Sequence, residues 1–133
     1  MDAVNIYIET GINPTESEDR VMKAIENVFA DLPVHVKPAR KGSILLARSE
    51  DMDSLTNLRN LLRRERIRSA ARKVLFEGLK GNTISFCLNK QVAYAGHISF
   101  SMVVGESPLG SISVQIECDD PRELINWLAP RKA

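Results

Sequence analysis

The chain has few of the side chains on which enzymes and metal proteins depend. It contains two cysteines, Cys87 and Cys118, and two histidines, His35 and His97, among 133 residues, and none of these four lies close to another in the sequence. Metal sites and redox motifs need such residues at short spacings. We therefore expect no metal site and no cofactor, and we expect both cysteines to be reduced and at least half-buried.

Long apolar segments are also absent. No run of about 18 apolar residues could form a membrane span, and Asp2 stands where a signal peptide would carry basic residues. At 133 residues with 44% hydrophobic composition, the chain has the size of one compact domain. We expect a single domain over residues 1–133 that is soluble, cytoplasmic and without contact to a membrane.

Net charge is small, at +1, but the charges are unevenly distributed. Residues 1–31 carry seven acids and two bases, whereas residues 37–80 carry twelve bases and five acids. The densest stretch, residues 59–73, has seven basic residues and one acid. Its basic residues are Arg59, Arg63, Arg64, Arg66, Arg68, Arg72 and Lys73. Such density favours a polyanion or a set of carboxylates as partner, although a plain solvated face is the alternative.

The first half of the chain reads as a strand, a helix and a hairpin. Residues 4–8 alternate apolar and polar side chains, as a half-buried strand does. Thr15 and Glu18 form a capping box that predicts a helix from about 15 to 31. Two short strands, 33–37 and 43–47, are joined by a turn with Arg40 and Lys41 at its tip.

The basic stretch contains two apolar stripes that do not share a helical phase. The first ends at Leu62 and the second begins at Ile67, a separation of five residues and about 140° on an α-helix. One straight helix could not bury both stripes, so we predict a break near Glu65 and two helices that meet at a corner. On this prediction Arg68 and Arg72 are the most exposed of the basic residues, while Arg59, Arg63 and Arg66 flank the core.

The second half is mainly a sheet. Period-two patterns predict strands over 84–88, 98–104 and 112–116, with a turn over 105–110 and a final helix that begins at Asp120. The fold class is therefore α+β, with an antiparallel sheet of about 5–6 strands and helices packed on one face.

The other face of that sheet should be polar and nearly free of positive charge. Its predicted residues are Tyr7, Ser85, Cys87, His97, Ser99, Ser101, Ser113 and Gln115. An RNA-recognition motif would need several stacking aromatics there, and only Tyr7 is available. Self-association, domain packing and plain hydration of this face all remain open.

Several segments resemble the archaeal UPF0201 family. They are Asn13-Pro14-Thr15-Glu16, the run from Leu88-Asn89-Lys90-Gln91 to Gly96, and Glu106-Ser107-Pro108-Leu109-Gly110-Ser111-Ile112. The resemblance spans nearly the whole chain. It implies an archaeal cytoplasmic protein with a ribosomal protein L5-like fold and a role in RNA binding. Some family members are fused to a P-loop kinase-like domain, but this chain has no Gly-x-x-x-x-Gly-Lys-Ser/Thr loop.

No catalytic motif is present. His97 and Cys87, predicted on adjoining strands, form the best candidate pair, but neither lies in a recognised nucleophile motif. We expect no enzymatic activity and identify no small-molecule substrate.

We predict that the chain binds structured or double-stranded RNA through its arginine-rich helical surface. Arginine suits phosphate because its planar fork donates two hydrogen bonds and stays charged. Lys90, Arg40 and Lys41 would extend this surface. Two alternatives remain open: a protein-interaction module or homodimer that pairs the basic middle with acidic surfaces, and an accessory partner of a nucleotide kinase-like enzyme.

Overall fold

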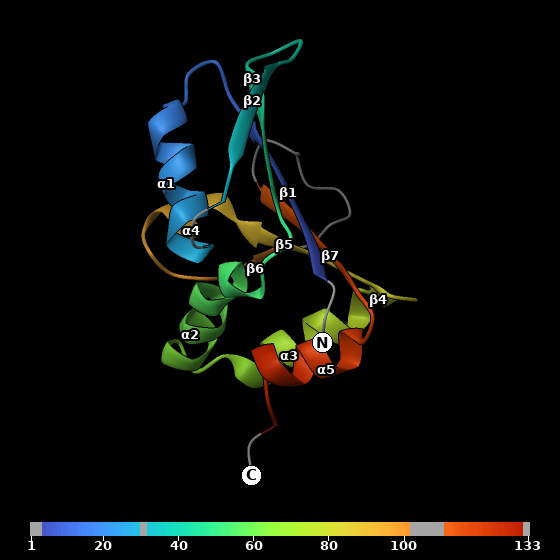
Figure 1. Cartoon of the computed structure of the whole chain (residues 1–133). Helices are drawn as coiled ribbons and strands as arrows, with labels where there is room; N and C mark the ends of the chain where they lie inside the picture. Colours follow the sequence, from blue (N-terminus) through green and yellow to red (C-terminus); the bar gives the residue numbers. More distant parts are fainter. Residues whose placement is uncertain (1–3, 30–31, 102–110, 132–133) are drawn as a thin grey trace.

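One antiparallel sheet with helices on one side forms the framework of the molecule (Figure 1). The computed structural model describes residues 4–29, 32–101 and 111–131. Within them the sheet has seven strands in the order β2-β3-β1-β7-β5-β4, and β6 pairs with the β4 side of β5. The strands are β1 (Val4–Ile12), β2 (Val34–Pro38), β3 (Ser43–Ser49), β4 (Leu79–Lys80), β5 (Thr83–Asn89), β6 (Phe100–Ser101) and β7 (Ser111–Cys118). The predicted α+β class is confirmed.

The helices gather on the buried face and at one end of the sheet. They are α1 (Glu18–Val28), the short 3-10 helix η1 (Met52–Leu55), α2 (Thr56–Arg64), α3 (Arg68–Glu77), α4 (Lys90–Tyr94) and α5 (Pro121–Leu128). In Figure 1, α1 and α4 lie beside each other, and α3 lies against α5 below the sheet. No helix in the described ranges is long and apolar enough to cross a membrane.

Alternation along the central strands separates the two faces of the sheet. Ile6 pairs with Ile116 and Ile8 with Val114, and all four side chains are buried in the core. Tyr7, between the two isoleucines, points to the opposite face and is exposed. The period-two pattern of the sequence therefore assigned the strand faces correctly.

The first helix is shorter than predicted and has a different cap. It begins at Glu18, and Ser17 rather than Thr15 is the N-cap residue, with its Oγ accepting from the Arg20 amide at 3.4 Å. The sequence around Asn13 folds instead into a turn in which the Glu16 amide donates to the Asn13 carbonyl at 2.9 Å. Because of this turn, Thr15 and Glu16 lie before the first residue of the helix.

The predicted break between two helices is confirmed. Helix α2 ends at Arg64 and α3 begins at Arg68, so each can turn its own apolar stripe, ending at Leu62 and starting near Ile67, toward the core. The last helix also begins as predicted, with Asp120 as N-cap accepting from the Glu123 amide at 3.1 Å.

In the second half of the chain, one short helix was not predicted, and one predicted strand lies only partly within the described residues. The short helix α4 was not predicted, because five residues are too few to show a helical period. Of the predicted strand 98–104, Phe100–Ser101 form β6, while residues 102–104 and the predicted turn 105–110 lie outside the described ranges.

The β2–β3 hairpin is held in place by a glycine at its tip. Gly42 has a φ of 78°, and a Cβ atom there would lie 2.0 Å from the Ile12 carbonyl oxygen. Only glycine combines this left-handed backbone with so close an approach. The hairpin tip, with Arg40 and Lys41, is therefore fixed beside the end of β1.

Candidate nucleic-acid interface

The corner between α2 and α3 is the most basic exposed part of the structure's helical layer. Arg63 and Arg64 form the last turn of α2, Arg66 lies in the connection, and Lys73 follows on α3; all four are exposed. Arg68 is half-buried at the first position of α3. Within the described residues, the side chains of Arg63, Arg66, Arg68 and Lys73 have no hydrogen bond or ion pair to the protein.

Arg66 has a backbone conformation that arginine rarely adopts. Its φ is 59°, and among the described non-glycine residues it alone has a positive φ. Its amide donates to the Arg63 carbonyl, and the Ile67 amide donates to the Leu62 carbonyl, both at 3.2 Å. These two bonds form a Schellman motif, in which the left-handed position is usually glycine. The motif ends α2 sharply and points the Arg66 side chain into solvent.

Two of the predicted RNA-binding arginines, Arg59 and Arg72, donate hydrogen bonds to other parts of the protein. Arg59 Nε donates to the Trp127 carbonyl at 2.9 Å, and Arg72 donates to the Ala129 carbonyl at 3.2 Å and to Asn126 Oδ1 at 2.6 Å. These carbonyls belong to the C-terminal end of α5, where a helix lacks internal donors and carries partial negative charge. Arg59 and Arg72 therefore cap α5.

Aromatic rings hold the same two arginines. The Arg59 guanidinium lies 5.2 Å from the centre of the Trp127 ring, and that of Arg72 lies 4.9 Å from the Phe76 ring. Cation–π contact at this distance stabilises both partners. The prediction that Arg68 and Arg72 are the most exposed basic residues is wrong, because both are half-buried. Arg63 and Arg66, predicted to flank the core, are exposed.

The corner is fixed to the loop that follows α4. An Arg64 terminal nitrogen donates to the Gly96 carbonyl at 2.9 Å, and the Glu65 carboxylate contacts His97 Nδ1 at 3.1 Å and accepts from the Ile98 amide at 3.4 Å. The hydrogen bond from His97 lowers the pKa of Glu65 below its usual value, against the opposing effect of burial. The one acid in the basic stretch is thereby turned toward the protein.

His97 and Cys87 are not neighbours, so the candidate catalytic pair is wrong. His97 lies in the loop after α4 and contacts Glu65, whereas Cys87 lies on β5 with its sulfur 3.7 Å from Ser113 Oγ. Cys87 and Cys118 are free and buried, as expected. No group of three potential metal-binding side chains occurs in the described part of the chain.

Lys90 is not on the surface, contrary to the prediction. Its side chain is 6% exposed, and Nζ donates to the Gly11 carbonyl at 2.8 Å and to Glu16 Oε1 at 2.9 Å. The same carboxylate oxygen accepts from the Asn13 amide at 2.8 Å. Burial raises the pKa of Glu16, but the hydrogen bonds from Asn13 and Lys90 outweigh it and hold the pKa below its usual value. Lys90 thus joins α4 to the turn after β1.

Arg40 and Lys41 do not extend the corner surface. Both are exposed, but Figure 1 shows the β2–β3 tip at the top of the view and α2 and α3 at the bottom. Strand β3 alone separates the tip from η1 by seven residues, roughly 23 Å. The basic residues therefore form two separate groups.

Comparison with known proteins places the chain in a family. A family model described as RNA binding matches residues 5–118. A UPF0201 protein of Sulfurisphaera tokodaii is 45% identical over 128 residues, covering 96% of this chain and 88% of the relative. A second, from Pyrobaculum aerophilum, is 41% identical over 121 residues, covering 90% and 85%. The chain belongs to the UPF0201 family.

Solved structures of UPF0201 proteins share the fold. The crystal structure of the Methanococcus jannaschii protein matches with a TM-score of 0.85 at 30% identity and covers 97% of this chain and 95% of its own. Another UPF0201 crystal structure matches with a TM-score of 0.82 at 32% identity, covering 96% and 94%. The predicted membership in UPF0201 is confirmed, whereas the likeness to ribosomal protein L5 stays a prediction.

The presence of Arg48 on the opposite sheet face was not predicted. Arg48 is exposed on that face, where its guanidinium lies 5.3 Å from the centre of the Tyr7 ring. The sequence contained a signal for this position, because Leu45 and Ala47 are apolar at a period of two and Arg48, the next residue, falls on the other face of the strand. Its partner strand could not be read from the sequence, so its position opposite Tyr7 was not foreseen.

Proposed function

We propose that this UPF0201 protein binds structured or double-stranded RNA through the α2–α3 corner, with Arg63 and Arg66 as principal phosphate contacts. The observation that carries the proposal is that exposed arginines without partners among the described residues gather at a sharp turn. Arg64, Arg68 and Lys73 would add to the same surface. The family's description as RNA binding supports the class of ligand.

The local electrostatics favour an anion at this corner. Helix α3 has no acidic residue in its first turn and no side-chain cap, so its positive end reinforces the neighbouring arginines. Glu65, the nearest acid in sequence, is turned to His97 and Ile98. Contacts of this kind recognise the backbone and shape of a folded RNA rather than its sequence.

A salt series with matched charge variants tests the proposal. The variant is Arg63→Gln with Arg66→Gln, and the control is Lys23→Gln with Lys80→Gln, which removes two exposed charges elsewhere. Binding of a labelled RNA stem-loop is measured between about 50 and 200 mM salt. The corner variant should flatten the slope of log K against log salt by about two units, while the control should keep the wild-type slope.

Two results would overturn the proposal. The first is absence of stem-loop binding by the wild type at about 50 mM salt, where phosphate contacts are strong. The second is an equal effect of the corner and control variants, which would mean that the RNA responds to net charge alone. Loss of an oligomer in the corner variant, measured by sedimentation, would instead favour the protein-interaction alternative.

A further inference from the structure

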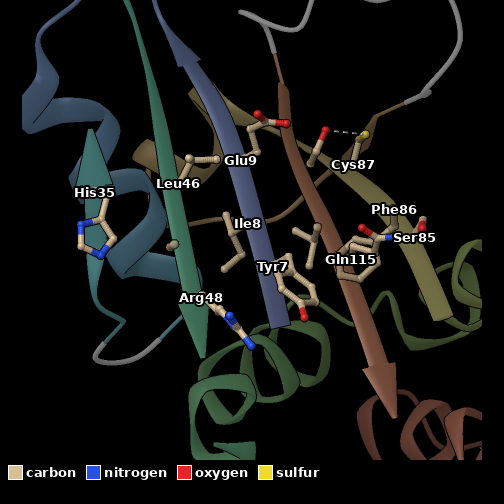
Figure 2. A pocket seen from close by; sticks show the side chains of 13 residues that line it. Tyr7, Ile8, Glu9, His35, Leu46, Arg48, Ser85, Phe86, Cys87 and Gln115 are labelled. Atoms are coloured by element: carbon tan, nitrogen blue, oxygen red, sulfur yellow. Dashed lines mark hydrogen bonds between the residues drawn. The ribbon is translucent and has the colours of Figure 1, made fainter. Parts of the chain in front are cut away.

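A cleft lies on the open face of the sheet, on the side opposite the core (Figure 2). It has a volume of about 560 Å³, within the usual range of ligand sites. The small side chains of Ser85 and Ser113 leave room above β5 and β7, while Tyr7 and His35 project from β1 and β2.

The central row of the cleft combines an aromatic ring with hydrogen-bonding groups on both sides. Tyr7 pairs with Arg48 on β3 and with Gln115 on β7, so these three side chains stand next to one another on the same face. The Tyr7 residue is 38% exposed. Aromatic and guanidinium planes are the surfaces on which proteins stack unpaired bases, and Gln or Arg beside them can read a base edge.

The neighbouring row carries a carboxylate. Glu9 lines the cleft, pairs with Leu46 and Ser113, and is exposed. A carboxylate disfavours a phosphate at this point but accepts hydrogen bonds from the amino group of a base. The floor of the cleft therefore suits a base rather than the backbone of a nucleic acid.

The hairpin that borders the cleft supplies the charge for a backbone. Lys37, Arg40, Lys41 and Arg48 are all exposed on or around β2 and β3, against one acid at the end of the hairpin, Glu50. Glu50 lies 3.4 Å from Arg48, with both side chains largely in solvent, so the pair is weak and can be displaced. From Ser43 to Arg48, β3 extends over roughly 17 Å, with β2 beside it at the edge of the sheet.

We propose that this open face binds a single-stranded RNA segment, with an unpaired base stacked on Tyr7 and the adjoining phosphates along the β2–β3 hairpin. The site uses side chains that the α2–α3 corner does not use, and it gives a role to the separate basic group at Arg40 and Lys41. It rests on the proposed function only for the class of ligand.

Two exposed tyrosines make a matched test. Tyr94 on α4 is 43% exposed and lies under the Arg20 guanidinium at 5.4 Å, much as Tyr7 lies under Arg48, but it is outside the cleft. Binding of a labelled single-stranded RNA of about eight nucleotides is measured by fluorescence anisotropy. Tyr7→Leu should weaken binding by about 5- to 100-fold, whereas Tyr7→Phe and Tyr94→Leu should bind as the wild type does.

A second variant probes the phosphates. Arg40→Gln with Lys41→Gln should flatten the salt slope for the single-stranded RNA by about 1.4 units, since single strands contribute about 0.7 per contact. Arg63→Gln with Arg66→Gln should leave this slope unchanged. These two pairs of variants separate the hairpin site from the corner site.

The inference is overturned if the single-stranded RNA does not bind at about 50 mM salt, if Tyr7→Leu binds it like the wild type, or if Tyr94→Leu weakens it equally. It is also overturned if sedimentation shows a dimer that Tyr7→Leu dissociates, because a second copy would then cover the face. If stem-loop binding fails while single-strand binding persists, the corner proposal falls and this inference stands. The reverse result rejects the inference alone.

Discussion

Replacement of Arg66 by glycine should make the protein more stable and a weaker RNA binder. The left-handed conformation of a non-glycine residue costs about 1–2 kcal/mol, and Arg66 has a φ of 59° in a Schellman motif. Glycine removes that cost but adds about 0.5–1 kcal/mol of chain entropy in the unfolded state. The net expectation is a gain of about 0.5–1 kcal/mol and a rise in Tm of about 2–5 °C.

Urea unfolding followed by circular dichroism measures the change, with the slope m as a check that the denatured state is unaltered. Arg63→Gly is the matched control, because it removes the same charge from an exposed position inside α2. There glycine should lower the free energy of unfolding by about 0.5–1 kcal/mol. If Arg66→Gly destabilises the protein as much as Arg63→Gly does, the argument from backbone strain is refuted.

The same variant measures what the arginine contributes to binding. Arg66→Gly should flatten the salt slope for the stem-loop by about one unit, as expected for one lost phosphate contact. Greater stability together with weaker RNA binding would show that arginine at this position lowers the stability of the fold but strengthens the binding of RNA. Unchanged binding would remove Arg66 from the interface.

Three further predictions concern charged residues that the structure assigns to stability. Arg72→Ala should lower the free energy of unfolding by about 1–2 kcal/mol, because the Ala129 carbonyl at the end of α5 loses its cap; an unchanged urea midpoint would contradict this role. Lys90→Met should lower the free energy of unfolding by about 2–3 kcal/mol at pH 7. The loss should be smaller than for a fully buried ion pair because Glu16 is partly exposed. An unchanged free energy of unfolding in the same assay would contradict this role. Since the folded pKa of Glu16 lies below its usual 4.5, its contribution is complete above that pH and is lost as pH falls through the lowered pKa. The free energy of unfolding of Glu16→Gln should not show this loss at acid pH. A pH dependence equal to that of the wild type would contradict the prediction.

Several elements were predictable from the sequence because their signals are local. The strand faces followed from period-two alternation around Tyr7, and the break near Glu65 followed from the phase of the apolar stripes. The cap at Asp120 was also readable. The first helix was predicted too long because Glu16, which looked like part of a first turn, bonds to Lys90, a residue 74 positions away.

The candidate interface was only partly predictable. The stretch 59–73 was correctly recognised as the basic one, but its members could not be sorted. Arg59 and Arg72 donate hydrogen bonds to the end of α5, more than 50 residues further along the chain. The sequence near the two arginines gives no signal for that contact. Arg63 and Arg66 have no such partner in the part of the chain that the structure describes.

The sequence by itself determined the kinds of the longer elements, their order and the density of positive charge, because side-chain period and composition act over a few residues. Tertiary structure alone decided which charges are available. It buried Lys90 against Glu16, used Arg59 and Arg72 to cap a helix, and placed the Arg40 tip at the far end of the sheet. A charged side chain that a carbonyl or carboxylate of the fold has already engaged is less available for binding, and that engagement depends on contacts between distant segments.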